Sequence, residues 1–208
     1  MELPERMFLL AYDSRRQRLA RWIDVGLLVR AAALAELELR GVLVDERGRA
    51  TLASSRRPEV TESLLREVLA EVGASAKPRR WQYWTERGRG KARAAVERRL
   101  VAARIISVER RRVFGIFPAR RIVVRDRRLI DQLHARVAEA LRARTVDSRD
   151  AATVALAAAG QLRTVFGWRQ RRANRKRIAE LTKASVPAAA KGLQKAIAAK
   201  YASSEGGG

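Results

Sequence analysis

The chain contains no cysteine among its 208 residues. Disulfide frameworks, thiolate zinc sites and cysteine nucleophiles are therefore excluded, and a reducing compartment fits the composition. Histidine is nearly absent as well, with His134 as the single example. Metal ligation and general base catalysis both need converging partner groups, so we interpret a lone histidine without cysteine as structural. No catalytic motif is present, and we expect neither enzymatic activity nor a bound metal or cofactor.

Long apolar segments are also missing. The longest uncharged run, residues 151–162, is rich in alanine. It is far shorter than the roughly 18 to 20 apolar residues that are needed to span a bilayer. The first residues, Met1 to Arg6, lack the basic region and apolar run of a secretory signal. We therefore expect a cytoplasmic protein whose contact with a membrane is peripheral and on the cytosolic face.

Acidic residues are scarce relative to basic ones. The chain has 45 Lys and Arg against 22 Asp and Glu, for a net charge of +23. Residues 1–76 carry twelve of each kind, whereas residues 77–128 carry eighteen cations and four acids. This localised excess predicts a polyanionic partner, and the 47% hydrophobic content excludes wholesale disorder. Arginine outnumbers lysine 38 to 7, which is typical of a GC-rich genome and indicates a bacterial source.

Periodic apolar patterns predict a mainly α fold. We expect a single globular helical domain, with central buried helices, flanking amphipathic helices and one or two short β-hairpins. The domain is predicted to cover residues 1–202, and residues 203–208 to form a flexible tail. The predicted helices are residues 24–40, 59–72, 90–104, 126–142, 149–166 and 186–201. The predicted hairpins are residues 42–52 and the segment around residues 105–121.

Arg30 stands in the middle of the most apolar helix. Between Val25 and Ala35 it is the only charged residue. A guanidinium in a protein core costs several kcal/mol unless it is paired. Two interpretations stay open: a distant acid or a snorkelling side chain accounts for Arg30, or Arg30 lines a pocket that receives an anion.

Arg89, Lys91 and Arg93 lie at the start of another predicted helix, beside two glycines. Free amides at a helix N-terminus, together with arginines, form a natural phosphate site. The glycine spacing is not that of a nucleotide-binding loop, and Arg93 is also placed to pair with Glu97 on a solvated helix face. The segment is therefore either a phosphate site or an ordinary charged surface.

The few large aromatic residues gather among arginines. Most tryptophans are half-buried core or rim residues. A ring beside cations also stacks on a base or a sugar, or lies at a membrane interface. The residues for which both interpretations stay open are Trp22, Trp81, Tyr83, Trp84 and Trp168.

An apolar hairpin candidate, Val113 to Pro118, is enclosed by arginines on both sides. Arg110 to Arg112 precede it, and Arg120 and Arg121 follow it. Guanidinium groups bind phosphates strongly and often bidentately. The apolar side chains at the tip either insert into lipid or are buried, including by a second subunit, because exposed apolar strands are normally avoided.

Four segments together resemble the Golgi phosphoprotein 3 family, including its bacterial members. They are Asp24 to Gly41, with Arg30-Ala31-Ala32-Ala33-Leu34-Ala35-Glu36-Leu37-Glu38-Leu39-Arg40-Gly41 as the most specific part, Arg93 to Ile106, Val113 to Pro118, and Asp147 to Asp150. The resemblance covers roughly residues 3–200. It implies a mainly helical single domain that docks peripherally on membranes. In eukaryotic members a tryptophan and arginines bind the head group of phosphatidylinositol 4-phosphate, a hairpin contacts the bilayer or another subunit, and cytosolic tails of glycosyltransferases are recognised.

Applied to this sequence, the resemblance assigns the lipid head-group site to Trp22, Arg30, Arg89 and Arg93. Arg30 and Arg93 match family arginines directly. Trp22 stands one residue closer to Arg30 than in the family pattern. The other family arginine falls on Gly90, which Arg89 replaces through a small local shift. In a bacterial protein phosphatidylinositol 4-phosphate is not expected, so another anionic lipid takes its place.

The sequence thus predicts a peripheral membrane adaptor with an arginine-lined pocket for anionic, phosphoinositide-like head groups. Its expected partners are an anionic phospholipid membrane, cytosolic tails of membrane enzymes and a second copy of the chain that binds through the hairpin. The hairpin residues assigned to the bilayer or to the second copy are Phe114, Ile116, Phe117, Arg120 and Arg121.

The alternative is a winged-helix-like nucleic-acid-binding protein, because a helix followed by a hairpin occurs twice. Charge does not separate the two functions, since phosphate dominates both partners. The apolar hairpin tip and the predicted burial of the helix that carries Arg30 favour lipid.

Overall fold

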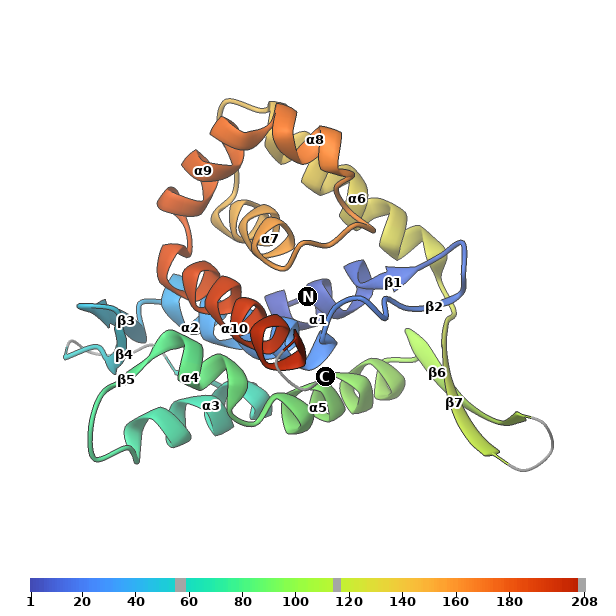
Figure 1. The fold of residues 1–208 in the computed structure, drawn as a ribbon, viewed down its shortest axis with the longest axis horizontal. Coiled ribbons are helices and arrows are strands. Elements are labelled where there is room, and N and C mark those ends of the chain that lie inside the picture. The colour runs from blue at the N-terminus through green and yellow to red at the C-terminus, as the bar shows by residue number, and fades with distance from the viewer. Residues whose placement is uncertain (55–58, 114–116, 206–208) are drawn as a thin grey trace.

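The computed structural model describes residues 1–54, 59–113 and 117–205, with the backbone alone at residues 110–113, 117–119 and 204–205. These residues form ten helices and three small antiparallel sheets, which confirms the predicted mainly α class (Figure 1). The helices are α1 (Leu3–Leu10), α2 (Val25–Leu39), α3 (Ser63–Gly73), α4 (Trp81–Glu86), α5 (Arg89–Ala102), α6 (Arg127–Arg142), α7 (Ser148–Ala159), α8 (Trp168–Ala173), α9 (Arg175–Ala184) and α10 (Pro187–Glu205). The strands are β1 (Tyr12–Asp13), β2 (Arg18–Leu19), β3 (Leu43–Glu46), β4 (Arg49–Leu52), β5 (Arg79–Arg80), β6 (Ile106–Val113) and β7 (Phe117–Val124).

α2 is the central helix. The Asp24 side chain caps its start by accepting hydrogen bonds from the backbone N–H groups of Gly26 and Leu27, which satisfies two of the free amides found at any helix start. Gly41 follows the helix with φ at 64°, a conformation that favours glycine. All residues from 25 to 37 are buried, against α1, α3, α4, α5, α7 and α10. The prediction for residues 24–40 is confirmed.

α7 is the second central helix, and it ends earlier than predicted. The apolar pattern predicted a helix to Phe166, but α7 stops at Ala159. A Cβ on the next residue, Gly160, would lie 2.9 Å from Leu28 Cδ1, and Gln161 then adopts a left-handed φ of 51°. The close contact with Leu28 of α2 favours a small residue at position 160, and the chain turns at Gln161. The apolar pattern continues past the turn because Leu162 and Phe166 are buried, not because the segment is helical.

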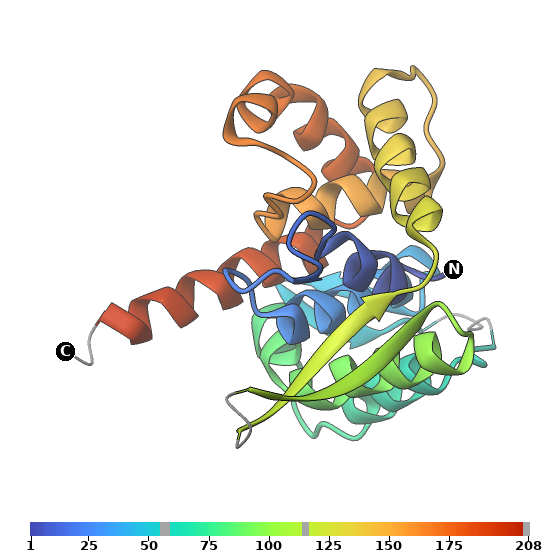
Figure 2. The ribbon, with the colours of Figure 1, turned by 90° about the vertical axis from the view of Figure 1, so that its right-hand side faces the viewer.

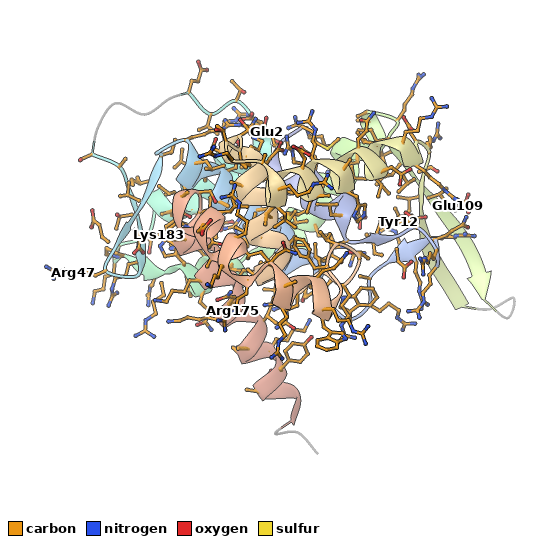
Figure 3. The ribbon with its side chains drawn as sticks, turned by 90° about the horizontal axis from the view of Figure 1, so that it is seen from above. Glu2, Tyr12, Arg47, Glu109, Arg175 and Lys183 are labelled. Atoms are coloured by element: carbon orange, nitrogen blue, oxygen red, sulfur yellow. The ribbon has the colours of Figure 1, made fainter. Side chains whose placement is uncertain are left out.

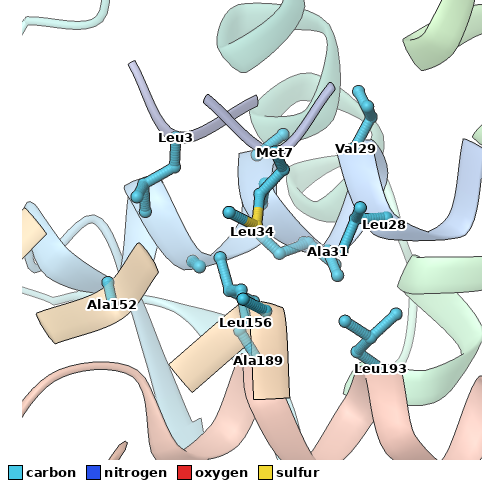
Figure 4. Close-up of a cluster of buried hydrophobic side chains, with 14 of the residues drawn as sticks. Leu3, Met7, Leu28, Val29, Ala31, Leu34, Ala152, Leu156, Ala189 and Leu193 are labelled. Carbon is cyan, nitrogen blue, oxygen red and sulfur yellow. The ribbon is translucent and has the colours of Figure 1, made fainter. Parts of the chain in front are cut away.

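The main core lies where α1, α2, α7 and α10 meet. Figure 4 shows Met7, Leu34, Leu156 and Leu193, one from each of these helices, directed toward the same volume. All four are fully buried, and complete burial of one such side chain stabilises the fold by about 1.5–3 kcal/mol. α1 was not predicted from the sequence, yet it supplies one layer of this core.

β3 and β4 form the predicted hairpin at residues 42–52. Arg47 and Gly48 both take positive φ, 53° and 81°, as a two-residue type I′ turn requires. β5 adds a third strand beside β4, and α4 follows it; neither was predicted. α3 begins at Ser63, four residues after the predicted start at Glu59.

β6 and β7 form the second hairpin, with eight antiparallel pairs. Ile106 and Val124 at its base are buried, and the far end projects away from the helices (Figure 1). Phe114 and Ile116 fall outside the described residues, as does the side chain of Phe117. The lipid or subunit contact of these three residues therefore stays a prediction.

The C-terminal part of the chain forms α8, α9 and α10. α10 continues through Glu205, so residues 203–205 are helical where the sequence predicted a tail, and residues 206–208 lie outside the described part. The end of α10 extends beyond the other helices (Figure 2). Over residues 1–54, 59–113 and 117–205, no helix combines the length and apolarity that a bilayer span needs.

Candidate functional site

Arg30 is held inside the protein by two partners. Its side chain is 1% exposed. Nε donates a hydrogen bond to the carbonyl oxygen of Trp84 at 3.0 Å, and Nη2 donates to Glu71 Oε2 at 2.6 Å. Burial lowers the pKa of Arg30, and the Glu71 carboxylate opposes that shift. Of the two interpretations left open by the sequence, the structure shows a distant acid, 41 residues away along the chain.

Gly88 closes over the guanidinium group of Arg30. It adopts a left-handed φ of 68°, and a Cβ at this position would lie 3.5 Å from Arg30 Nη1. Gly88 is also the residue from which α5 starts. Arg30 thus joins α2, Glu71 of α3 and the end of α4 directly beneath the first turn of α5. Its position makes it a residue that orients α5, while its own charge is turned away from solvent.

Arg89 and Arg93 lie in the first half of α5 and are exposed, with 46% of each side chain accessible. Arg89 Nε lies 3.6 Å from Asp24 Oδ2, and Arg93 Nε donates a hydrogen bond to Glu97 Oε1 at 2.9 Å. The second is the pair that helical spacing predicted. Asp24 is half-buried and Glu97 is buried, so it is the guanidinium end of each ion pair that faces solvent and is placed to contact a phosphate.

Each of these two acids is shared with a second cation. Asp24 Oδ2 accepts a hydrogen bond from Lys200 Nζ at 2.7 Å, and Glu97 Oε2 accepts one from Arg120 Nη2 at 3.3 Å. Burial opposes ionisation of Asp24, but hydrogen bonds from Lys200 and from the start of α2 hold its pKa below the ordinary value. Both acids are therefore outnumbered by the cations that surround them.

Arg121 adds a further cation near the base of the hairpin. Its Nη2 donates to the uncharged side chain of Gln17, in the turn between β1 and β2. Glu109 lies opposite Arg121 in the hairpin and adds a third acid, so this group of residues holds five positive charges against three negative charges. We call it the α5–hairpin surface, which consists of Arg89, Arg93, Arg120, Arg121 and Lys200 with the acids Asp24, Glu97 and Glu109.

Trp22 lies two residues before Asp24 but faces another part of the molecule. It lines a cavity of about 670 Å³ whose walls also include Arg15, Arg16 and Arg163, whereas Arg30, Arg89 and Arg93 are not in that lining. The buried Nε1 of Trp22 has no hydrogen-bond partner within the part of the chain that the structure describes. Its carbonyl oxygen accepts a hydrogen bond from the Tyr201 hydroxyl at 3.1 Å. The predicted site residues therefore do not form one pocket: Arg89 and Arg93 are exposed on α5, Arg30 is buried beneath that helix, and Trp22 lines a neighbouring cavity.

The other aromatic residues divide between core and surface. Trp81 and Trp84 are buried, and Trp81 Nε1 donates to Asp45 Oδ1 at 2.7 Å, which confirms the core interpretation for both. Tyr83 is partly exposed between two arginine side chains. Trp168 is 70% exposed, and the guanidinium of Arg169 lies 5.6 Å from its ring centre. Trp168 is the exception to the core interpretation.

The most specific part of the resemblance, residues 30–41, also contains structural charges. Glu36 is fully buried and accepts hydrogen bonds from the backbone N–H of Leu3 at 3.0 Å, from Arg40 at 3.2 Å and from Arg149 at 2.7 Å. Arg40 in turn forms two hydrogen bonds with Glu62. We call these residues the Glu36 network. It ties the start of α1 and the end of α2 to the start of α7.

The family model for Golgi phosphoprotein 3 (GPP34) matches residues 3–199. With nearly the whole chain matched, this mainly helical single-domain protein belongs to the Golgi phosphoprotein 3 family. No curated protein matches the chain.

Sequence reasoning missed the acids that complete the site. Glu71 lies on the amphipathic helix α3 and, by spacing alone, looks like any other solvated acid. Asp24 was expected only as the first residue of a helix. The sequence feature that pointed to Glu71 was Arg30 itself. A charge in an apolar helix requires an acid from elsewhere in the chain.

Proposed function

We propose that this protein is a peripheral membrane adaptor without enzymatic activity, and that its α5–hairpin surface binds anionic lipid head groups. The observation that supports this most directly is the sharing of Asp24 and Glu97, each between two cations. Such a surface keeps a net positive charge after all its internal ion pairs are made. The attraction of a basic residue to an anionic membrane surface is worth about 1 kcal/mol.

In this proposal the four predicted head-group residues have different roles. Arg89 and Arg93 contact the phosphate. Arg30 acts through α5, because it fixes the turn from which that helix starts. Trp22 borders the site from the side of the neighbouring cavity, and its backbone helps to hold the segment that carries Asp24.

Peripheral anchoring generally needs two signals. The arginines supply the electrostatic one. The apolar hairpin tip, with Phe114, Ile116 and Phe117, supplies the other by entering the bilayer or by binding a second copy of the chain. Cytosolic tails of membrane enzymes are proposed as clients, in line with what the family resemblance implies.

The test is flotation with vesicles of phosphatidylcholine alone and of phosphatidylcholine mixed with an anionic phospholipid. The wild-type protein is expected to float only with anionic vesicles, and less at high salt. Arg93→Glu reverses one charge and should weaken binding by about tenfold or more. Arg142→Glu is the matched control, because Arg142 is also exposed on a helix beside an acid but lies outside the α5–hairpin surface. Equal flotation with both vesicle types, or equal effects of the two variants, would contradict the proposal.

The winged-helix alternative loses the first of its two helix–hairpin units, because α2 is buried. A recognition helix must expose one face to the major groove, whereas α2 is buried from residue 25 to residue 37. A gel shift with duplex DNA that persists at physiological salt and prefers one sequence would reverse this choice.

A further inference from the structure

A second cavity, of about 400 Å³, lies between α7, α9 and α10 and includes one residue of α8. Its floor consists of buried alanines of α7 and α10, and Ile178 and Ala179 of α9 form part of its wall. Arg171, Arg175 and Lys183 line its rim. The volume falls within the range of about 300–1,000 Å³ that is usual for small-molecule sites.

The cavity exists because small side chains face one another across the helices that enclose it. Alanine leaves the surface of α7 shallow, and the covering helices contribute little to the core. α8 has no buried residue, and Leu181 is the buried residue of α9. A ligand can therefore occupy the space without displacing packed core side chains.

The rim of this cavity is cationic, and its lining contains no acid. Arg171, Arg175 and Lys183 make no side-chain ion pair or hydrogen bond with the residues that the structure describes. Arg177 on the same segment differs, because it binds Glu180 at 3.2 Å. Figure 3 shows Arg175 and Lys183 on the face of the molecule that α9 covers. The three rim charges are thus free to bind a ligand.

We propose that this cavity binds a single acyl chain that ends in a carboxylate or a phosphate. The chain lies on the alanine floor, and the anionic end binds Arg171, Arg175 and Lys183 through charge-assisted hydrogen bonds. The buried floor is recessed between helices, where the flat surface of a bilayer does not reach. A partner helix, about 10–12 Å across, would need a longer open groove. This site is separate from the α5–hairpin surface, whose residues do not line the cavity.

The direct experiment measures binding of a fluorescent fatty acid to the full chain, with palmitate, lysophosphatidic acid and the methyl ester of palmitate as competitors. Palmitate and lysophosphatidic acid should displace the probe, and the better of the two identifies the head group. The methyl ester keeps the chain but lacks the charge, and it should compete at least about tenfold more weakly.

Two pairs of matched variants separate the cavity from general surface charge. Arg171→Glu/Arg175→Glu changes two rim residues, whereas Arg172→Glu/Lys176→Glu changes their exposed neighbours outside the lining. The first pair should weaken probe binding by about tenfold or more, and the second should leave it nearly unchanged.

Filling the cavity provides an independent check. Ala179→Phe places a large side chain in the cavity from an exposed wall position, and Ala184→Phe makes the same change at an exposed position of α9 outside the lining. Ala179→Phe should abolish probe binding at an unchanged melting temperature, while Ala184→Phe should bind as the wild-type protein does.

Equal losses in both charge-reversal pairs, or competition by the methyl ester as strong as that by palmitate, would overturn the proposal. So would normal probe binding by Ala179→Phe, or saturable binding of an acidic amphipathic peptide with no binding of palmitate. Vesicle flotation of the same variants keeps the two proposals distinct. In the cavity variants, loss of palmitate binding with normal flotation assigns palmitate to the cavity and flotation to the α5–hairpin surface. A wild-type protein that floats with anionic vesicles but does not bind palmitate overturns the cavity proposal alone. A wild-type protein that binds palmitate but does not float overturns the membrane proposal alone.

Discussion

The Glu36 network and the α5–hairpin surface contain the same residue types, arginines and carboxylates, but have different effects. The first stabilises the fold, and the second leaves an excess of positive charge. In the first, arginines converge on a carboxylate that is fully buried, and backbone and side-chain donors satisfy it from several elements. In the second, the half-buried Asp24 and the buried Glu97 are each shared by two exposed cations, and positive charge is left over. The balance of acids and cations thus decides what the arginines contribute: where acids match them they fix helices, and where they outnumber the acids they attract anions.

The largest expected loss of stability comes from removing the buried carboxylate of the Glu36 network. Glu36→Ala leaves Arg40, Arg149 and the start of α1 without their shared acceptor, and loss of one partner from a buried ion pair costs about 3–5 kcal/mol. Urea unfolding should show this decrease in the free energy of unfolding. Glu139→Ala is the control, because the Glu139–Arg142 pair is exposed and is worth at most about 1 kcal/mol. A similar loss in both variants would mean that burial is not the deciding factor.

The second prediction contrasts Arg30 with Arg93. Arg30→Met leaves Glu71 and the Trp84 carbonyl without their donor, and we expect it to lower the free energy of unfolding by about 2–4 kcal/mol. Arg93→Met should change it by no more than about 0.5 kcal/mol and should instead weaken flotation with anionic vesicles. The prediction is contradicted if the Arg30→Met variant has the same urea unfolding midpoint as the wild-type protein but no longer binds lipid. In that case Arg30 contacts the head group directly.

A third prediction concerns Glu38, a carboxylate that has no arginine partner in the described part of the chain. It accepts hydrogen bonds from the backbone N–H groups of Ala188 and Ala189 at the start of α10. Burial, together with the nearby charge of Asp45, raises the pKa of Glu38 to about 7 despite these hydrogen bonds. The folded state therefore binds this proton more tightly than the unfolded state does.

Because of this difference, the stabilising contribution of Glu38 should be lost as pH rises from its ordinary value of 4.5 to about 7. Glu38→Gln keeps an acceptor without the charge. Its free energy of unfolding relative to the wild-type protein should increase by about 1–3 kcal/mol over this range. Chemical denaturation at several pH values measures this difference, and a difference that stays constant with pH would contradict it.

The smallest effect is expected for Trp168. Its ring is mostly exposed, and α8 buries no residue, so Trp168→Ala should change stability by less than about 0.5 kcal/mol. Trp81→Ala removes a buried ring with a hydrogen-bonded Nε1 and should cost about 3–5 kcal/mol. Thermal unfolding of the two variants compares an exposed and a buried tryptophan in the same protein.

Caps and periodicity were sufficient to predict much of the fold. The helix at residues 24–40 was predicted from its apolar pattern and from Gly41, and the first hairpin from its turn. α1 and α4 were missed because one or two helical turns show too little periodicity. The early end of α7 was missed because the buried Leu162 and Phe166 continue the apolar pattern beyond the turn at Gln161.

The candidate site was predicted less completely for a related reason. Local spacing was enough to propose the pairing of Arg93 with Glu97, which are four residues apart. The partners of Arg30 and Arg89 come from helices that are distant in the sequence, and no periodic pattern specifies them. The cavity that Trp22 lines is formed by segments distant in the sequence, among them the turn between β1 and β2 and the helix α6.

The last helix has a consequence for the order in which the chain assembles. α10 packs against α2, α4 and α7, and Lys200 near its end binds Asp24, 176 residues earlier. Contacts between such distant segments form slowly because a long loop must first be closed. On the ribosome the N-terminal helices emerge first. The apolar surface that α10 covers in the folded protein stays uncovered until α10 has been synthesised. Until that helix arrives, the growing chain exposes core surface, so this protein should depend on chaperones late in synthesis more than early.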